Sequence, residues 1–456
     1  MQSQDSTRKV DQDISMYKGP VGPLRHRCPL CPSSRPAAGS QLLRCGGCRA
    51  FRYCGREHQA AHRLEHKRAC AKIKNARSKL VREDHAVRNA TPDFMTPANA
   101  FETCVGQFWG ILSTRDYMRA RFALARLLFL LGTLDGVGEG LEHLRDMLRL
   151  CRGDNMGVRN IMPALMLRLD LDQECYDFMK WWATCDPDGT YDWGDMTLPY
   201  LSIRGADVFE EPGFLLGKYA NLDYVVALLI LKLKLLIDII NLKVTRKVLA
   251  RRHLPFELRD QIERDVVRSP LSAKVQKESP ESFHKTETTL LDHIRQLSKT
   301  IMENNEAFTL NLLDPEDALT SQPSAYTRGS WEEMALVMQN SYAAWWETEG
   351  VLDLLRDALV CAARDLQGLG FGVLRDENER LVTERLADVG PNFDLYADWV
   401  WRYLYYAVEN ASYLGPWPER PSEKYTREGK ENKARTEFRA LFTYEPSSDD
   451  EEAFIC

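Results

Sequence analysis

Apolar residues recur at helical spacing along most of the chain, most clearly after residue 100. From Phe101 to about Leu249, runs of apolar residues are separated by short breaks that contain glycine, proline or aspartate. Apolar positions that repeat every three to four residues indicate amphipathic helices. The pattern predicts helices over residues 122–131, 137–150, 156–169, 173–182 and 222–242. This part of the chain is therefore predicted to be all-α.

The helical pattern resumes after a polar stretch at residues 269–282 that contains two Ser-Pro steps. It predicts helices over residues 283–313, 331–369 and 393–414, with a turn or hairpin near 371–382. The last helix carries an aromatic stripe from Tyr396 to Tyr406. Large rings at this spacing usually fill a core between helices, although such a stripe could also line a peptide groove.

Two segments of the first helical region share one pattern. In each, a run of apolar residues is followed by a short break and then by a predicted helix that begins with acidic residues. Leu131-Gly132 aligns with Leu169-Asp170 at an offset of 38 residues. This offset is near the period of tetratricopeptide repeats, in which helix pairs stack. We therefore expect a mostly α body built either as a tetratricopeptide-like helical repeat or from ordinary antiparallel helix pairs.

The composition is ordinary for a soluble globular protein. The chain has 456 residues, of which 44% are hydrophobic and 28% charged, and this length predicts about three domains. The most apolar stretch, 222–242, is interrupted by Asp223, Lys232, Lys234 and Asp238. Its uninterrupted part is shorter than the about 20 residues of a membrane helix. The first 20 residues have no apolar core, so we expect neither a secretory signal nor a membrane anchor.

Six of the twelve cysteines lie between Cys28 and Cys70, together with three histidines. In chain order they form the pairs Cys28/Cys31, Cys45/Cys48, Cys54/His58 and His66/Cys70. Two pairs have the C-x2-C spacing of a turn, and two have the i, i+4 spacing of one helix face. Thiolate and imidazole are ligands that zinc prefers, and eight of them complete two closed, structural sites. The spacing leaves open which turn serves which helical pair.

The order of these ligands, with Tyr53 before Cys54, resembles the MYND zinc finger. The resemblance implies two interleaved structural zinc sites. Site one would be Cys28, Cys31, Cys54 and His58, and site two would be Cys45, Cys48, His66 and Cys70. His58 stands where the family more often has cysteine. His62 lies four residues from both His58 and His66 and could compete with either as a ligand. The family pattern leaves it out, so we expect it to be an exposed helix histidine. Residues 25–72 are called the finger below.

The resemblance also suggests a partner. The best known MYND fingers bind short proline-rich peptides through a Gln and a Trp that follow the sixth ligand. This chain has Gln59 at the first position but Arg63 at the second. A guanidinium packs on a proline ring less well than an indole does, although it can stack. The finger is therefore expected to bind a proline-rich peptide, to be mainly structural or to meet a different partner.

Charge offers a second partner class. Fifteen Lys/Arg and two Glu lie between Arg25 and Arg82, whereas the whole chain has a net charge of −6. A basic module could contact the phosphates of nucleic acid. Lys72, Lys74, Arg77, Lys79 and Arg82 also alternate with apolar residues, which is typical of a solvated helix face. Pairing with acidic residues of the same chain, or of a partner protein, is the remaining alternative.

The pattern divides the chain into seven parts. We expect a disordered N-terminus (1–24), the finger (25–72), a charged helix and linker (73–98), a helical domain (99–268), a linker (269–282), a C-terminal helical domain (283–415) and a tail (416–456) that is acidic and disordered at its end. The six cysteines outside the finger are scattered, and we expect small buried or inert thiols. Reduced, metal-bound thiols fit the nucleus or cytoplasm.

The sequence lacks the common catalytic motifs. It contains no Asn-His-Ser-Cys, which methyltransferases of the SET class carry beside MYND fingers, and no nucleotide-binding glycine motif or H-E-x-x-H. We therefore expect no enzyme but a zinc-binding adaptor, with the finger and the helical body as two protein-binding surfaces. The chain resembles the MYND-finger proteins of filamentous fungi that have large helical bodies. The first alternative is a nucleic-acid-associated transcriptional regulator that uses the basic finger region. The second is a lysine methyltransferase without a recognisable SET motif.

Overall fold

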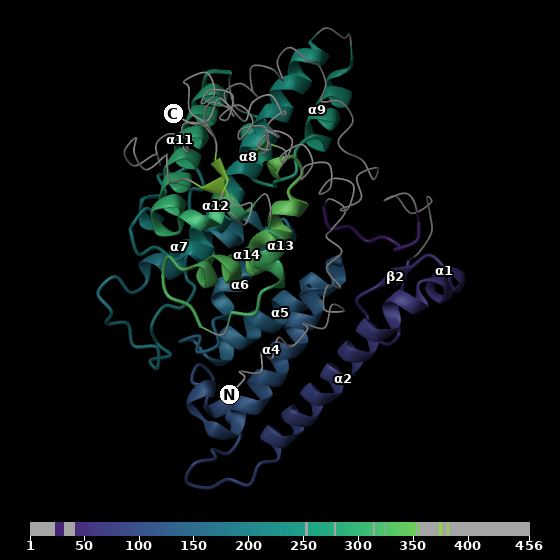
Figure 1. Cartoon of the computed structure of the whole chain (residues 1–456), viewed down its shortest axis with the longest axis vertical. Helices are drawn as coiled ribbons and strands as arrows, with labels where there is room; N and C mark the ends of the chain where they lie inside the picture. The colour runs from purple at the N-terminus through teal and green to yellow at the C-terminus, as the bar shows by residue number, and fades with distance from the viewer. Residues whose placement is uncertain are drawn as a thin grey trace, which may run out of the picture.

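The computed structural model describes residues 23–31, 42–250, 254–277, 280–312, 315–323, 325–352 and 354–355, together with strands at 374–375 and 381–382. Within these residues the fold is mostly α, as the sequence predicts (Figure 1). The helices are α1 (Arg56–Ala61), α2 (Arg63–Arg88), α3 (Ala100–Thr103), α4 (Arg115–Phe129), α5 (Leu134–Leu150), α6 (Val158–Arg168), α7 (Asp172–Thr184), α8 (Leu222–Leu249), α9 (Phe256–Asp265), α10 (Ser272–Val275), α11 (Pro280–Asn304), α12 (Glu306–Leu312), α13 (Glu316–Thr320) and α14 (Trp331–Glu347).

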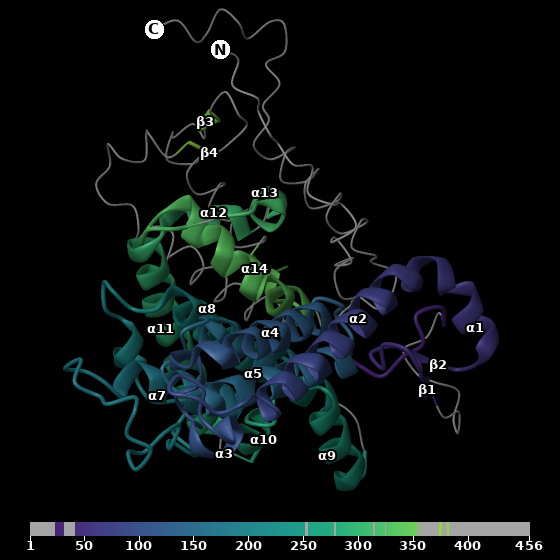
Figure 2. The ribbon, with the colours of Figure 1, turned by 90° about the horizontal axis from the view of Figure 1, so that it is seen from below.

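Short strands and 3-10 helices complete the described part. Strand β1 (Leu43–Arg44) pairs antiparallel with β2 (Arg52–Tyr53), and β3 (Leu374–Arg375) pairs antiparallel with β4 (Leu381–Val382). The second pair lies where the sequence predicts a hairpin. The 3-10 helices are η2 (Phe108–Gly110), η3 (Leu112–Thr114) and η4 (Gly213–Leu215). Figures 1 and 2 place β1, β2 and α1 at one edge of the molecule, with α2 running back along α4.

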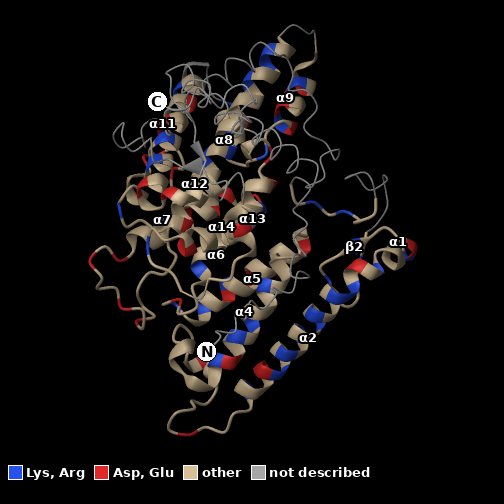
Figure 3. Cartoon of the chain, in the orientation of Figure 1, with Lys and Arg blue, Asp and Glu red and all other residues tan. Residues whose placement is uncertain are grey.

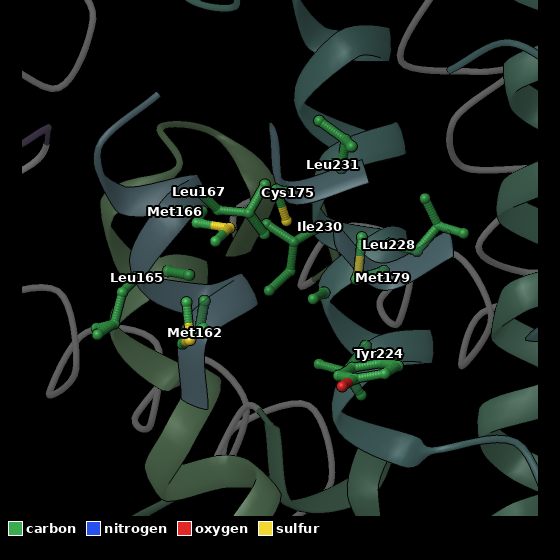
Figure 4. Close-up of a cluster of buried hydrophobic side chains, with 14 of the residues drawn as sticks. Met162, Leu165, Met166, Leu167, Cys175, Met179, Tyr224, Leu228, Ile230 and Leu231 are labelled. Carbon is green, nitrogen blue, oxygen red and sulfur yellow. The ribbon is translucent and has the colours of Figure 1, made fainter. Parts of the chain in front are cut away.

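Helix α8 is the centre of the body. Its residues are apolar on almost every side, and a helix of this kind must be covered all round. It packs against α6, α7, α11 and α14. Met162 and Met166 of α6, Met179 of α7 and Leu228 of α8 belong to one buried cluster (Figure 4). None of the described helices is long and apolar enough to cross a membrane.

The polar residues that interrupt α8 are buried and bonded. Lys234 donates to Asp170 at 2.6 Å and to Asp172 at 2.8 Å. Asp238 accepts hydrogen bonds from the backbone N–H of Ser269 at 2.8 Å and from the Ser272 hydroxyl at 2.6 Å. Buried polar groups are tolerated when they are bonded in this way. These residues therefore connect α8 to its neighbours as well as interrupting its apolar surface.

The stretch predicted to be a linker, residues 269–282, differs from that expectation where it is described. Ser269, Leu271, Ser272 and Val275 are buried against the body, and α10 forms there. The reason is the bonding to Asp238, which turns two polar serines into core residues. The aromatic helix predicted over 393–414 and the acidic tail lie outside the described residues.

The tetratricopeptide-like arrangement is not confirmed. In such a repeat each helix pair contacts the pairs next to it in sequence. Here α6 packs on α5 and α7 but also on α8 and α14, which are far away in the chain. The two similar segments arise from turns of the same kind. Gly132 and Asp170 both have positive φ, at 64° and 57°, and each follows the end of a helix.

A buried ion pair joins α6 to α14 and generates the first prediction. Arg168 donates from Nε and Nη2 to the two carboxylate oxygens of Glu347, both at 2.8 Å, and both side chains are almost completely buried. Glu347→Gln is expected to lower the free energy of unfolding by about 3–5 kcal/mol, because the buried Arg168 charge loses its carboxylate. Urea unfolding monitored by circular dichroism measures this change. Arg168→Met/Glu347→Leu, which removes both charges, should lower the free energy of unfolding much less. An equal loss in the single and the double variant would contradict the interpretation of this contact as a buried ion pair.

Candidate metal centre

The first cluster is assembled from three short segments. Cys28 and Cys31 lie in a turn closed by the hydrogen bond from the Cys31 N–H to the Cys28 carbonyl, at 3.2 Å. Cys54 follows β2, and His58 lies in α1. The Nδ1 atom of His58 is 3.1 Å from the Cys54 Sγ and 3.5 Å from the Sγ atoms of both Cys28 and Cys31. All four donor atoms lie within 4.8 Å of one another.

The second cluster is built between the β1–β2 turn and α2. Cys45 and Cys48 lie in the turn, and His66 and Cys70 lie one helical turn apart on the buried face of α2. The Nε2 atom of His66 is 3.3 Å from the Cys45 Sγ and 3.6 Å from the Cys48 Sγ. The Sγ atoms of Cys45 and Cys70 are 3.8 Å apart. These four donor atoms also lie within 4.8 Å of one another, and all four residues are buried.

A glycine permits this close approach. A Cβ atom on Gly47 would lie 2.7 Å from the Cys70 Sγ, so a side chain at this position would collide with the thiol. The turn continues through Arg49, which has a φ of 62°, and its N–H donates to the Cys45 carbonyl at 2.9 Å. The tight turn therefore aims Cys45 and Cys48 at α2.

Both clusters fit zinc. Zinc–sulfur bonds of about 2.3 Å arranged tetrahedrally separate neighbouring sulfurs by about 3.8 Å, close to the 3.6 Å between the Cys31 and Cys54 Sγ atoms and the 3.8 Å of Cys45 and Cys70. Burial, with the charges of Cys45 and Cys70, raises the pKa of Cys48 to about 12. Such closely packed thiols cannot all ionise without a cation, and a divalent ion supplies the missing charge. Burial also lowers the pKa of His66 to about 4, which keeps its imidazole neutral, as ligation requires.

The structure therefore brings the eight residues together in the two sets that the resemblance implies. Each set combines one C-x2-C turn with one helical pair, and the sets interleave along the chain. Four protein donors complete a tetrahedral zinc site, so both sites are structural in kind. The two sites differ in exposure: site two is wholly buried, whereas Cys54 of site one is exposed.

The expectation for His62 is wrong. This residue is 8% exposed and belongs to neither cluster. Its Nδ1 atom is 3.0 Å from the hydroxyl oxygen of Tyr53, and its ring stacks on His66 with ring centroids 5.7 Å apart. A bend between α1 and α2 turns His62 inward, which the helical spacing alone did not indicate. His62 therefore acts beside the second cluster by packing on its imidazole ligand.

The finger shares its apolar core with the body. Tyr53, Ile73 and Cys48 form one buried cluster with Leu124 and Leu128 of α4. Helix α2 begins in the finger and packs along α4, so the segment predicted as a charged helix and linker continues the finger directly into the body. A zinc finger is usually too small for a hydrophobic core of its own. Here α4 supplies the missing side.

Two carboxylates of α5 bind the basic side of the finger. Arg44 of β1 donates to Asp135 at 2.6 Å, and Arg52 of β2 donates to it at 2.5 and 2.9 Å. Arg77 of α2 pairs with Glu139 and donates to the Cys48 carbonyl at 2.9 Å. Although burial opposes ionisation, the hydrogen bonds from Arg77 lower the pKa of Glu139 to about 2. Internal pairing thus accounts for part of the basic charge of the finger.

Sequence reasoning missed Asp135 and Glu139. Both belong to an expected helix, in which exposed acidic residues are common. The only sequence feature that points to Asp135 is its place in the first turn of α5, after Thr133, whose hydroxyl accepts from the Gly136 N–H at 3.1 Å. A carboxylate is favoured there by the helix dipole. Nothing in the spacing connects it with arginines more than 80 residues earlier.

The residues predicted to contact a peptide stay accessible. Gln59 is half-buried in α1, and Arg63, the first residue of α2, is exposed. The two residues lie on either side of His62, at which α1 ends and α2 begins. Leu64 beside Arg63 is 91% exposed. These three residues near the junction of the two helices are called the α1–α2 surface below.

The difference in burial between the two clusters predicts different responses to ligand loss. Cys54→Ser and Cys48→Ser should each remove about one of two zinc ions, which elemental analysis by mass spectrometry measures. Only Cys48→Ser is expected to speed hydrogen exchange in α4 as well, because Cys48 lies in the cluster that packs on this helix. If Cys54→Ser loosened α4 to the same extent, the proposed asymmetry would be incorrect.

The Asp135 bonds predict a specific coupling of finger and body. Asp135→Asn should destabilise the docked finger by about 2–3 kcal/mol, because two arginines lose a charged and largely buried partner. Faster hydrogen exchange in β1 and β2, with both zinc ions retained, is the expected observation. Asp116→Asn, which removes an exposed pair with Arg119, is the control and should have almost no effect.

Comparison with known proteins agrees with this geometry. Residues 27–70 match the family model of the MYND finger. Neither the curated proteins nor the solved structures contain a match to this chain. The match includes all eight ligand positions, from Cys28 to Cys70. Residues 27–70 are a MYND finger, with two Cys/His clusters that fit two structural zinc ions.

Proposed function

We propose that this chain is a non-enzymatic, zinc-dependent adaptor that binds one protein on the finger and another on the helical body. MYND fingers generally mediate protein–protein interactions, and this chain contains one. The observation that carries the proposal is the docking of the finger by Asp135, Glu139 and α4. A docked finger has a fixed orientation relative to the body, which is what an adaptor needs to hold two partners in a defined geometry.

The α1–α2 surface is the proposed contact for the first partner. Arg63 and Leu64 are exposed on the docked finger, and the contacts with the body use β1, β2 and residues further along α2. Leu64 and Arg63 together offer apolar and cationic contact, and interface anchors of this kind suit a short peptide. A proline-rich peptide could stack on the Arg63 guanidinium while Gln59 bonds its backbone. The clusters themselves are closed by four protein donors each, which supports a binding role.

The test is quantitative affinity capture with mass spectrometry, in the presence of nuclease. Arg63→Ala/Leu64→Ser changes only exposed side chains, so both clusters and the docked finger should remain. We expect at least one captured protein to be lost, because removing an interface anchor costs about 2 kcal/mol or more. Calorimetry with that protein and the purified chain should then show direct binding that the variant lacks.

A matched control removes the same residue types elsewhere. Leu112→Ser/Arg119→Ala replaces an exposed leucine in η3 and an exposed arginine in α4 and should leave the captured set unchanged. If the finger variant and the control retain the same partners, the α1–α2 surface is not a binding site. Binding of S-adenosylmethionine by the zinc-loaded chain, measured by calorimetry, would instead favour a methyltransferase.

A further inference from the structure

Helix α2 has one side on which several cations have no ion pair with the described residues. The buried face of this 26-residue helix carries His66, Cys70, Ile73 and Val87, and Arg77 at its border is paired with Glu139. The other sides carry a set of cations, Lys67, Lys72, Lys74, Lys79 and Arg82, called the α2 basic face here. All of them except the half-buried Lys72 are exposed.

The acidic residues of α5 that pair with the finger bind elsewhere. Asp135 and Glu139 bind arginines on the docked side of the finger. Between Arg63 and Arg82 the helix itself holds a single acidic residue, Glu65. Among the described residues, the structure gives the four lysines no ion pair, and Arg82 has only the exposed contact with Glu83 at 3.3 Å. Figure 3 shows that Lys and Arg, in blue, recur along much of α2. Charge is therefore concentrated there although the whole chain has a net charge of −6.

The length and regularity of the face suit a repeating polyanion. A rise of 1.5 Å per residue places Lys67 and Arg82 about 22 Å apart along one straight helix. Duplex DNA carries one negative charge per about 1.7 Å of its axis, so its backbones offer several phosphates along this length. Lysine binds phosphate as a point charge and needs no fixed orientation.

The same face is poorly suited to the other anionic surfaces. A protein partner needs buried apolar or aromatic anchors at the centre of its interface. Among the described residues of the basic face, Val81 is the one large apolar residue that is exposed. An amphipathic helix that binds a membrane surface inserts its apolar face into the lipid. The apolar face of α2 already packs against α4. No aromatic residue lies between Arg63 and Arg82, so single-stranded bases find no ring on which to stack.

We propose that the α2 basic face binds the phosphate backbone of double-stranded nucleic acid without reading its sequence. This goes beyond the adaptor function, and it uses residues outside the α1–α2 surface. The chemistry is that of phosphate contacts, which position a protein on a duplex but carry no base information. Protein binding by the finger and duplex binding by α2 would then occur on neighbouring surfaces of the chain.

The test measures binding of the full-length, zinc-loaded chain to a fluorescent duplex of about 30 base pairs with arbitrary sequence, by anisotropy. We expect binding that weakens with salt, with a slope of log K against log salt concentration of about −4.5 for the five cations. Lys74→Glu/Lys79→Glu/Arg82→Glu avoids the zinc ligands and should weaken binding by at least about tenfold and bring the slope to about −2. A second duplex of unrelated sequence should bind equally well.

The control separates the place of the charges from their number. Lys274→Glu/Lys277→Glu/Lys285→Glu makes the same change in net charge at exposed positions near α10 and α11, and it should alter affinity by less than about threefold. Equal losses in the two variants would overturn the proposal, as would absence of binding by the unmodified chain at about 50 mM salt. If the chain preferred one duplex sequence over the other, the proposal that it binds only the phosphate backbone would be wrong. Arg63→Ala/Leu64→Ser should keep duplex binding, so failure of the adaptor proposal is distinguishable from failure of this one.

Discussion

The buried face of α2 is the feature on which the finger and its attachment depend. Along this one face lie two ligands of the second cluster, His66 and Cys70, then the core residue Ile73 and the ion-pairing Arg77. The i, i+3 and i+4 spacing of a helix puts them in one line. Metal binding, apolar packing and docking therefore use consecutive turns of the same helix. A change in the rotation of α2 would disturb all three at once.

The sequence predicted the finger better than its surroundings, for a physical reason. Cysteine and histidine at fixed spacing are rare enough to identify a metal site, and the two clusters follow the resemblance residue by residue. The long helices were also predictable, because their apolar periodicity is strong. The burial of His62 and the docking through Asp135 were not, since both depend on contacts between distant segments. Spacing along one chain carries little information about such contacts.

The polar residues of the body show the same limit. Asp238 and the serines at 269 and 272 each look like solvent-exposed residues in sequence, yet they bond one another inside the core. Lys234 similarly joins α8 to the start of α7 through Asp172. Pairing of buried polar groups decides whether a polar stretch is a linker or part of the core. That pairing becomes visible only in three dimensions.

The Arg77 side chain has a consequence for the energetics of the whole unit. One guanidinium binds Glu139 of the body and the carbonyl oxygen of Cys48, a ligand of the second cluster. Zinc affinity and docking are then linked equilibria, and linkage is reciprocal. If docking raises the zinc affinity of the second cluster by some factor, bound zinc raises the equilibrium constant of docking by the same factor. The helical body and the second cluster are thus joined through one side chain, so a change in one of them bears on the free energy of the other.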